Sequence, residues 1–287
     1  MLPFRNILFP IDYSEPCGAV VPYAKEMIRH FSANLTLVHA YGPEALARSD
    51  RAITDPGLPE EVRLIEEQRL RQFALETFPG LHVESIVELG EPGSVIHKVV
   101  QRQGTDLVML ATHGHGPIRR LLLGSVTAKV LHDVSAAVWT STGAVVTGGH
   151  TSRMPCRSVL CAVDETDEAE AVLKAAVAFA SGYKARLWLV HIVEPPITTM
   201  EIDVPGYTKG LMDAADFRLR ELKGKLAVDI PHTVINATVS NGIREEAARR
   251  DADLVITGRG RAQASFYTLL SRLYPIVRES PCPVLSI

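Results

Sequence analysis

The stretch Asp106–Leu131, DLVMLATHGHGPIRRLLLGSVTAKVL, indicates how the chain folds. Its first part, Leu107–Leu110, is a short apolar run of the kind that forms a strand buried on both faces. A loop with two glycines follows at Thr112–Pro117, and Leu121–Leu131 then has a helical pattern with a Gly-Ser pair in its first turn. Such an arrangement aims backbone N–H groups and a helix dipole at an anion. The stretch therefore predicts a phosphate site, although the pattern also fits a plain strand-to-helix turn with an N-cap.

Apolar strand patterns alternate with helical patterns along the rest of the chain. The expected strands are Asn6–Ile11, Leu35–Ala40, His82–Glu88, Leu107–Leu110, Ala136–Thr140, Arg157–Val163, Arg186–His191, Thr233–Val239, Leu254–Thr257 and Pro283–Ile287. The expected helices are Ser14–His30, Glu60–Thr77, Pro92–Arg102, Leu121–Leu131, Asp167–Ser181, Tyr207–Leu226, Ile243–Arg250 and a last one ending near Arg278. This alternation predicts the α/β class, with open, mostly parallel sheets covered by helices on both faces.

The two halves of the sequence repeat each other. Two pairs of residues lie 152 positions apart and two lie 147 apart: Asp12 and Asp164, His39 and His191, Asp106 and Asp253, Ala111 and Gly258. One deletion of five residues in the second half accounts for both offsets, which indicates a duplication. A segment of small residues and glycine, 142–153, separates the copies. We expect two domains, residues 1–143 and residues 155–287.

Composition excludes several classes of protein. The 287 residues are 46% hydrophobic and 22% charged, and the net charge of −3 gives no reason to expect a nucleic-acid partner. No apolar run reaches the roughly 18 residues of a membrane helix, so no membrane partner is expected. The N-terminal residues lack the pattern of a signal peptide, and the four cysteines lack metal-ligand spacing. These features predict a cytoplasmic protein with reduced thiols.

Two residues and one loop fall at expected carboxyl ends of strands, which is where open α/β sheets bind ligands. They are Asp12, Ala40 and the loop 111–125. The Asp12 carboxylate can accept hydrogen bonds from a ribose hydroxyl or an amino group, or it can cap the next helix. The sequence leaves these two roles open.

Other polar residues near the loop carry weaker signals. His113 and His115 lack a clear third ligand, so no metal site is predicted. His39 and His191 fit structural histidines at strand ends, and Arg119 and Arg120 fit a solvated face or a screen for a polyphosphate. No paired nucleophile and base are evident, so no catalytic residue is assigned.

Several motifs together resemble those of the universal stress protein family. They are Pro10-x-Asp12-x-Ser14 after the first strand, LVHA at the end of the second, and a glycine pattern with a final Gly-Ser pair after the fourth. The resemblance covers both halves. It implies two tandem Rossmann-like domains of the adenine nucleotide alpha hydrolase type, each a five-stranded parallel sheet of order 3-2-1-4-5. Members of the family that keep the glycine motif bind ATP, and members that lose it do not.

In the first half the resemblance assigns a nucleotide site with ATP as ligand and Mg²⁺ accompanying the nucleotide. The matched positions are Pro10, Asp12, Ala40, Leu110, Ala111, Gly114, Gly124, Ser125 and Val126. One of them departs from the family pattern, because Ala111 stands where the first motif glycine is expected. Alanine is the smallest such change, and the expectation of ATP binding remains.

The second half departs further from the pattern. Asp164 and Gly258 are kept, but Arg261 replaces the second glycine, and Ser271-Arg272 replaces the Gly-Ser pair. Two interpretations stay open. This half has lost ATP and is a structural partner, or Arg259, Arg261 and Arg272 bind another anion by charge.

The resemblance implies an ATP-binding, nucleotide-dependent regulator or binding module of the stress response, which at most hydrolyses ATP slowly. The alternatives are an ATP-using enzyme, either a slow ATPase or an adenylating one, and a structural interaction protein without a ligand. The expected partners are an adenine nucleotide and a second copy of the chain in a homodimer.

Overall fold

The fold was analysed in a computed structural model that describes residues 2–42, 58–112, 123–141, 154–195, 206–259 and 266–287. The chain divides into two compact units, Pro3–Ala144 and Val145–Ile287. The expected domain limits at 143 and 155 border on a segment outside the described residues, so they stay a prediction. Each unit is described by itself.

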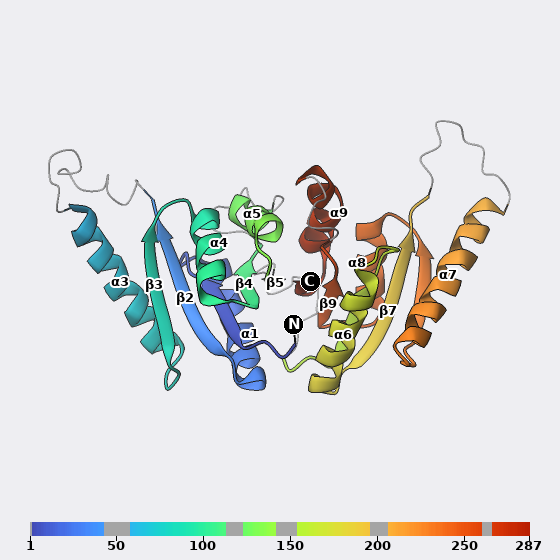
Figure 1. The fold of residues 1–287 in the computed structure, drawn as a ribbon, viewed down its shortest axis with the longest axis horizontal. Helices are drawn as coiled ribbons and strands as arrows, with labels where there is room; N and C mark the ends of the chain where they lie inside the picture. The colour runs from blue at the N-terminus through green and yellow to red at the C-terminus, as the bar shows by residue number, and fades with distance from the viewer. Residues whose placement is uncertain (1, 43–57, 113–122, 142–153, 196–205, 260–265) are drawn as a thin grey trace. The chain divides into compact units, whose positions relative to one another are not determined.

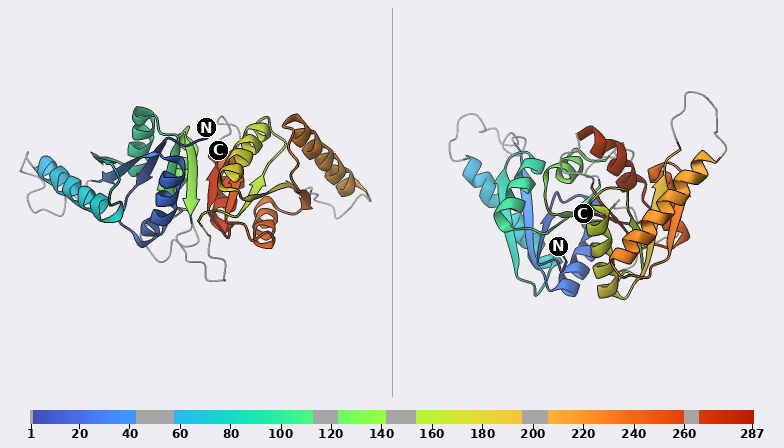
Figure 2. Two further views of the ribbon diagram at one scale, coloured as in Figure 1. Left: turned by 90° about the horizontal axis from the view of Figure 1, so that it is seen from below. Right: turned by 45° about the vertical axis from the view of Figure 1, so that its right-hand side comes forward.

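The first unit is a parallel sheet with the strand order β3-β2-β1-β4-β5. Its strands are β1 (Asn6–Pro10), β2 (Asn34–Tyr41), β3 (Val83–Leu89), β4 (Leu107–Ala111) and β5 (Ala137–Ser141). Its helices are α1 (Glu15–Phe31), α3 (Leu58–Thr77), α4 (Pro92–Gln103) and α5 (Ser125–Asp133). Helices cover both faces of the sheet, and α4 packs against α5 (Figures 1 and 2).

The second unit repeats this order as β8-β7-β6-β9-β10, again with parallel pairs. Its strands are β6 (Ser158–Ala162), β7 (Arg186–Val193), β8 (His232–Asn236), β9 (Leu254–Thr257) and β10 (Val284–Ser286). Its helices are α6 (Ala169–Tyr183), α7 (Tyr207–Lys225), α8 (Val239–Arg249) and α9 (Phe266–Glu279). Both units therefore have the strand order 3-2-1-4-5, and the predicted fold class is confirmed.

The central strands hold the cores of both units, because each is covered on two faces. Every residue of β6 and β9 is buried, as are the first four of β4. The edge strand β8 is only half-buried, and its pattern is correspondingly more polar.

The repeat extends to individual hydrogen bonds. The Asp106 carboxylate accepts from the backbone N–H groups of Arg5 (2.7 Å) and Asn6 (3.2 Å). Asp253 accepts in the same way from Arg157 (2.7 Å) and Ser158 (3.1 Å), which lie 152 positions further on. These equivalent contacts support the duplication that the offsets predicted.

The predicted end of β8 and the predicted start of α8 were wrong. The strand expected at Thr233–Val239 ends at Asn236, where its neighbour β7 also ends at Val193, because a strand continues only while it has a partner. The helix expected from Ile243 begins four residues earlier, at Val239, directly behind that shorter strand.

Candidate functional site

The carboxyl ends of β1, β2 and β4 lie at one edge of the first sheet, because the three strands are parallel neighbours. Pro10, the last residue of β1, is half-buried, and so are Ala40 near the end of β2 and Ala111 at the end of β4. Leu110 is buried beneath them. The structure thus brings the described nucleoside-side positions of the predicted site to a single edge.

Asp12 is held at this edge by a short turn. Its Oδ1 atom accepts hydrogen bonds from the backbone N–H of Ser14 (2.9 Å) and from the Ser14 hydroxyl (2.6 Å). The Ser14 hydroxyl in turn accepts from the N–H of Cys17 (3.2 Å), so Ser14 is the N-cap of α1. The capping role considered for Asp12 is therefore taken by Ser14, and the exposed Asp12 carboxylate faces the edge with a fixed orientation.

Tyr13 follows Asp12 with a φ of 60°, a left-handed conformation that is costly for a residue with a large side chain. Its ring lies 5.0 Å from that of His39 and 5.8 Å from that of Phe73, between ring centroids. The Arg69 guanidinium stands 3.9 Å above the Tyr13 ring. Burial raises the pKa of Tyr13 to about 12, the Arg69 charge opposing this shift, so the phenol stays neutral.

His39 and His191 are structural, as predicted. Nδ1 of His39 lies 2.7 Å from the carbonyl oxygen of Ile11, and Nδ1 of His191 lies 2.8 Å from that of Val163. Each ring therefore ties the end of the second strand of its unit to the end of the first. Nε2 of His39 also lies 3.6 Å from Glu66 on α3, a neighbour that the sequence pattern did not identify.

The described residues next to the predicted phosphate side are the end of β4 and the start of α5. The N–H of Gly124 donates to the carbonyl of Thr112 (2.8 Å), and the Thr127 hydroxyl donates to that of Ala111 (2.9 Å). These bonds draw the start of α5 back to the end of β4. The helix was expected from Leu121, but it begins at Ser125 with Gly124 as its N-cap.

Gly124 supplies no side-chain cap, and its φ of −59° is ordinary. A left-handed backbone is therefore not the reason for a glycine at this position. The first N–H groups of a helix have no partner inside it, and an uncapped start leaves them to an external acceptor. Ser125 is exposed in this first turn and Val126 is half-buried beside it.

Part of the predicted site lies outside the described residues. This concerns Gly114, His113, His115, Arg119 and Arg120 in the first half and Arg261 in the second. Within the described ranges, no group of three or more His, Cys, Asp or Glu side chains could hold a metal ion. Nor does any helix in those ranges have the length and apolar character to cross a membrane.

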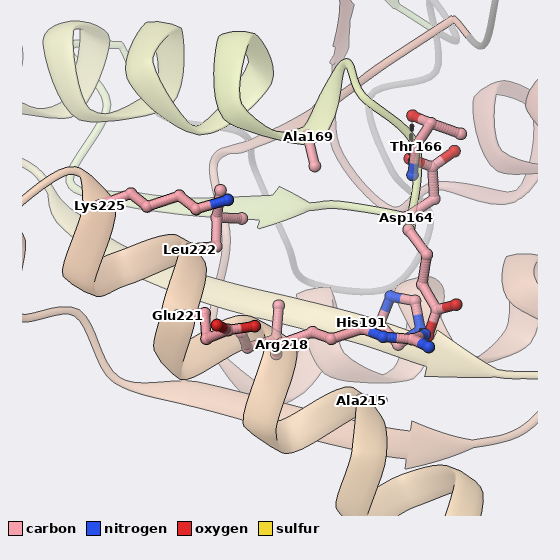
Figure 3. A pocket seen from close by; sticks show the side chains of 11 residues that line it. Asp164, Thr166, Ala169, His191, Ala215, Arg218, Glu221, Leu222 and Lys225 are labelled. Atoms are coloured by element: carbon pink, nitrogen blue, oxygen red, sulfur yellow. Dashed lines mark hydrogen bonds and ion pairs between the residues drawn. The ribbon is translucent and has the colours of Figure 1, made fainter.

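The same edge of the second unit has a different shape. Asp164 keeps the turn of Asp12, since its Oδ1 accepts from the N–H (3.1 Å) and the hydroxyl (2.5 Å) of Thr166. Glu165 stands at the position of Tyr13 and forms an ion pair with Arg218 of α7. Figure 3 shows the Arg218 side chain extending from α7 toward His191. A cavity of about 880 Å³ opens at the carboxyl ends of β6, β7 and β9, and a smaller one of about 440 Å³ adjoins it around His191 and Arg218.

The second phosphate-side helix also differs. An offset of 147 places Gly124 at Ser271 and Ser125 at Arg272. Because α9 begins at Phe266, these two positions lie inside the helix rather than at its start. Backbone N–H groups there bond within the helix and cannot cradle a phosphate.

Comparison with known proteins agrees with this architecture. The sequence profile of the universal stress protein family matches residues 3–140 and again residues 155–287. A putative universal stress protein of Staphylococcus haemolyticus is 28% identical over 141 residues, which cover 48% of this chain and 84% of that protein. A universal stress protein of Methanocaldococcus jannaschii is 23% identical over 143 residues, 45% of this chain and 88% of that protein.

Solved structures show the fold over nearly the whole chain. A universal stress protein from Archaeoglobus fulgidus superposes with a TM-score of 0.68 at 20% identity, covering 98% of this chain and 95% of that one. With the family profile matched twice, and with the same strand order and anchoring hydrogen bonds in both units, the chain belongs to the universal stress protein family as a tandem member.

Proposed function

We propose that the first unit binds ATP, accompanied by Mg²⁺, and that the protein is a nucleotide-dependent regulator or binding module of the stress response. Membership of the universal stress protein family supports nucleotide binding in general. The observation that carries the finer proposal is the start of α5. This helix begins at Ser125 behind a glycine without a side-chain cap, next to an edge where Asp12 is already oriented.

The residues fit the parts of the nucleotide in turn. The Asp12 carboxylate accepts hydrogen bonds from ribose hydroxyls, which are donors of the right kind. The small side chains of Ala40 and Ala111 leave space for a flat base and a sugar at the strand ends. The N–H groups of Ser125 and Val126, with the Ser125 hydroxyl, meet phosphate oxygens at the positive end of α5.

Mg²⁺ enters with the phosphates in this account. Among the described residues no cluster of carboxylates could hold the ion by itself. Mg²⁺ keeps several waters and binds through substrate phosphates, so a dedicated protein cage is not required. The proposal includes assembly as a homodimer and, at most, slow hydrolysis of ATP.

The test uses the substitution Ser125→Glu. A carboxylate in the first turn stabilises a helix through its dipole, so the variant keeps its fold while it repels phosphate. Isothermal titration with Mg-ATP is expected to show one nucleotide per wild-type chain and at least about a hundred-fold weaker binding, about 2.7 kcal/mol, in Ser125→Glu.

The control is Arg272→Glu, which introduces the same residue at the equivalent position of the second unit and should leave ATP affinity unchanged. Equal binding by wild type and Ser125→Glu would reject the site. Mass spectrometry of nucleotide that co-purifies with the native chain identifies the ligand, and a phosphate-release assay separates a binder from an ATPase.

A further inference from the structure

The second unit has a cavity that the proposed ATP site does not use. Its volume of about 880 Å³ lies in the range of small-molecule sites, and all of its lining residues belong to this unit. It opens where β6, β7 and β9 end, so that their last residues and the following turns form its floor.

Most of the wall is apolar and well packed. The buried side chains of Val172 from α6, Ile243 from α8 and Leu273 and Ile276 from α9 enclose the cavity, and Val190 of β7 lies at its floor. Fixed aliphatic side chains on all these elements form a preformed, dry surface for an apolar body.

Substitutions relative to the first unit account for the smaller cavity of about 440 Å³ that adjoins it. Arg69 lies against Tyr13, and Arg218 lies against Glu165, so α3 and α7 correspond with an offset of 149. By that offset, Glu66 is replaced by Ala215 beside His191. The aromatic ring beside the first histidine is thus absent from the second unit, and the carboxylate near Nε2 of His191 (3.9 Å) comes from Glu165 instead.

Charges are distributed unevenly around the cavity. Arg259 follows the end of β9 and Arg272 belongs to α9, and both line the cavity, as does the exposed Glu194 after β7. Asp164 lies at the end of β6, the neighbouring strand, and both described donors to its carboxylate end on Oδ1. Arg218 is paired with Glu165 and adds little net charge.

Arg259 has lost part of its hydration. Burial lowers its pKa to about 10, and the carboxylate of Glu168 only partly offsets that effect. Charge–charge attraction is stronger in such surroundings than at an exposed position, because it is less screened by solvent.

We propose that this cavity is a second ligand site, for a small organic anion with one carboxylate or phosphate monoester and an apolar or ring-shaped body. The oxyanion meets Arg259 and Arg272, whose planar guanidinium groups suit bidentate contact. A hydroxyl or amino group on the body donates to Asp164, and the body itself lies against the aliphatic wall. A polyphosphate tail is disfavoured, because α9 presents side chains where α5 presents free N–H groups.

The experiment follows 1-anilinonaphthalene-8-sulfonate by fluorescence on the full chain. This probe has an aromatic body, one N–H donor and one oxyanion. We expect one saturable site, weakened by about ten-fold or more in the Arg259→Gln, Arg272→Gln double variant. The matched control Arg278→Gln lies on the same helix and pairs with Glu279, and it should leave the affinity unchanged. Equal affinities in all three proteins would overturn the proposal.

Competition identifies the oxyanion. Phenyl phosphate and benzoate share a ring and differ only in the charged group, so the stronger competitor shows which oxyanion the arginines prefer. Phenol has the ring without the charge at neutral pH and is expected to compete at least about ten-fold more weakly. Competition by phenol as strong as by both anions would contradict the role of the arginines.

Two further variants protect the test. Arg272→Gln alone alters an exposed residue and is expected to weaken the probe even if the Arg259 change impairs folding. Ala214→Trp places a large ring into the cavity from α7 and should displace the probe. Ser125→Glu should keep the second site while it removes ATP from the first, so failure of one site is distinguishable from failure of the other.

Discussion

The starts of α5 and α9 differ, so the same fold has a different carboxyl edge in each unit. In the first unit the helix after β4 begins at Ser125, behind an uncapped glycine. In the second unit the equivalent helix begins at Phe266, six positions before the residue that corresponds to Ser125. The strands beneath are the same in order and direction. A shift in one helix start thus exchanges backbone donors for side-chain cations at the place where a phosphate would bind.

The two units also differ at the edge where a nucleoside would lie. Tyr13, Phe73 and Glu66 crowd the histidine of the first unit, whereas Glu165 and Ala215 leave a cavity beside that of the second. The first unit thus places an aromatic ring and a carboxylate beside its histidine, next to a helix start without a side-chain cap. The second has room for a wider apolar body and charges for a single oxyanion.

The largest expected effect concerns the two equivalent aspartates, Asp12 and Asp164. Asp12→Ala should weaken ATP binding by about a hundred-fold, because charge-assisted hydrogen bonds to the ribose contribute about 1.5–3 kcal/mol. Asp164→Ala should leave ATP affinity within about two-fold, since its unit holds no ATP in this account. Titration calorimetry on both variants measures this. A loss of ATP binding in Asp164→Ala would mean that the nucleotide binds in the second unit, which contradicts the proposal.

The second prediction concerns the shared scaffold. Asp253→Ala removes the acceptor for two backbone N–H groups in a buried setting and should lower the free energy of unfolding by about 2–4 kcal/mol. Asp106→Ala removes the same pair of bonds closer to solvent and should cost about 1–2 kcal/mol. Urea denaturation measures both. A larger loss of unfolding free energy in Asp106→Ala than in Asp253→Ala would contradict the expected order.

The smallest expected effect concerns the position in the second unit that corresponds to the Gly-Ser pair. The double change Ser271→Gly, Arg272→Ser restores the Gly-Ser pair of the first unit. Because the pair lies within α9, we expect no second ATP and a stoichiometry that stays at one per chain. Calorimetry that gave two ATP per chain would mean that residue identity, rather than the helix start, decides nucleotide binding.

Much of this architecture could be predicted from the sequence. Buried strands are short apolar runs, and the offsets of Asp12, His39, Asp106 and Ala111 to their second copies placed both sheets correctly. The confirmed strand order and the structural role of the two histidines rest on such local and repeated signals.

The differences between the carboxyl edges of the two sheets could not be predicted from the sequence. The start of α9 is absent from the motif pattern, because apolar residues at helical spacing continue back through Leu269 and Phe266 and give no boundary. The left-handed backbone of Tyr13 and its contact with Arg69 depend on tertiary packing. The smaller cavity of the second unit is lined by Ala215 on α7, a replacement whose offset, 149, matches neither of the repeat offsets.

The central claim is that helix-start N–H groups bind phosphate in the first unit and are missing from the second. Residue-resolved amide hydrogen exchange, with and without Mg-ATP, tests it most directly. The account predicts that ATP slows exchange at Ser125, Val126 and Thr127 in the first turn of α5, and leaves Arg272 and Leu273 within α9 unchanged. Protection by ATP at Arg272 and Leu273, or at neither helix, would contradict it.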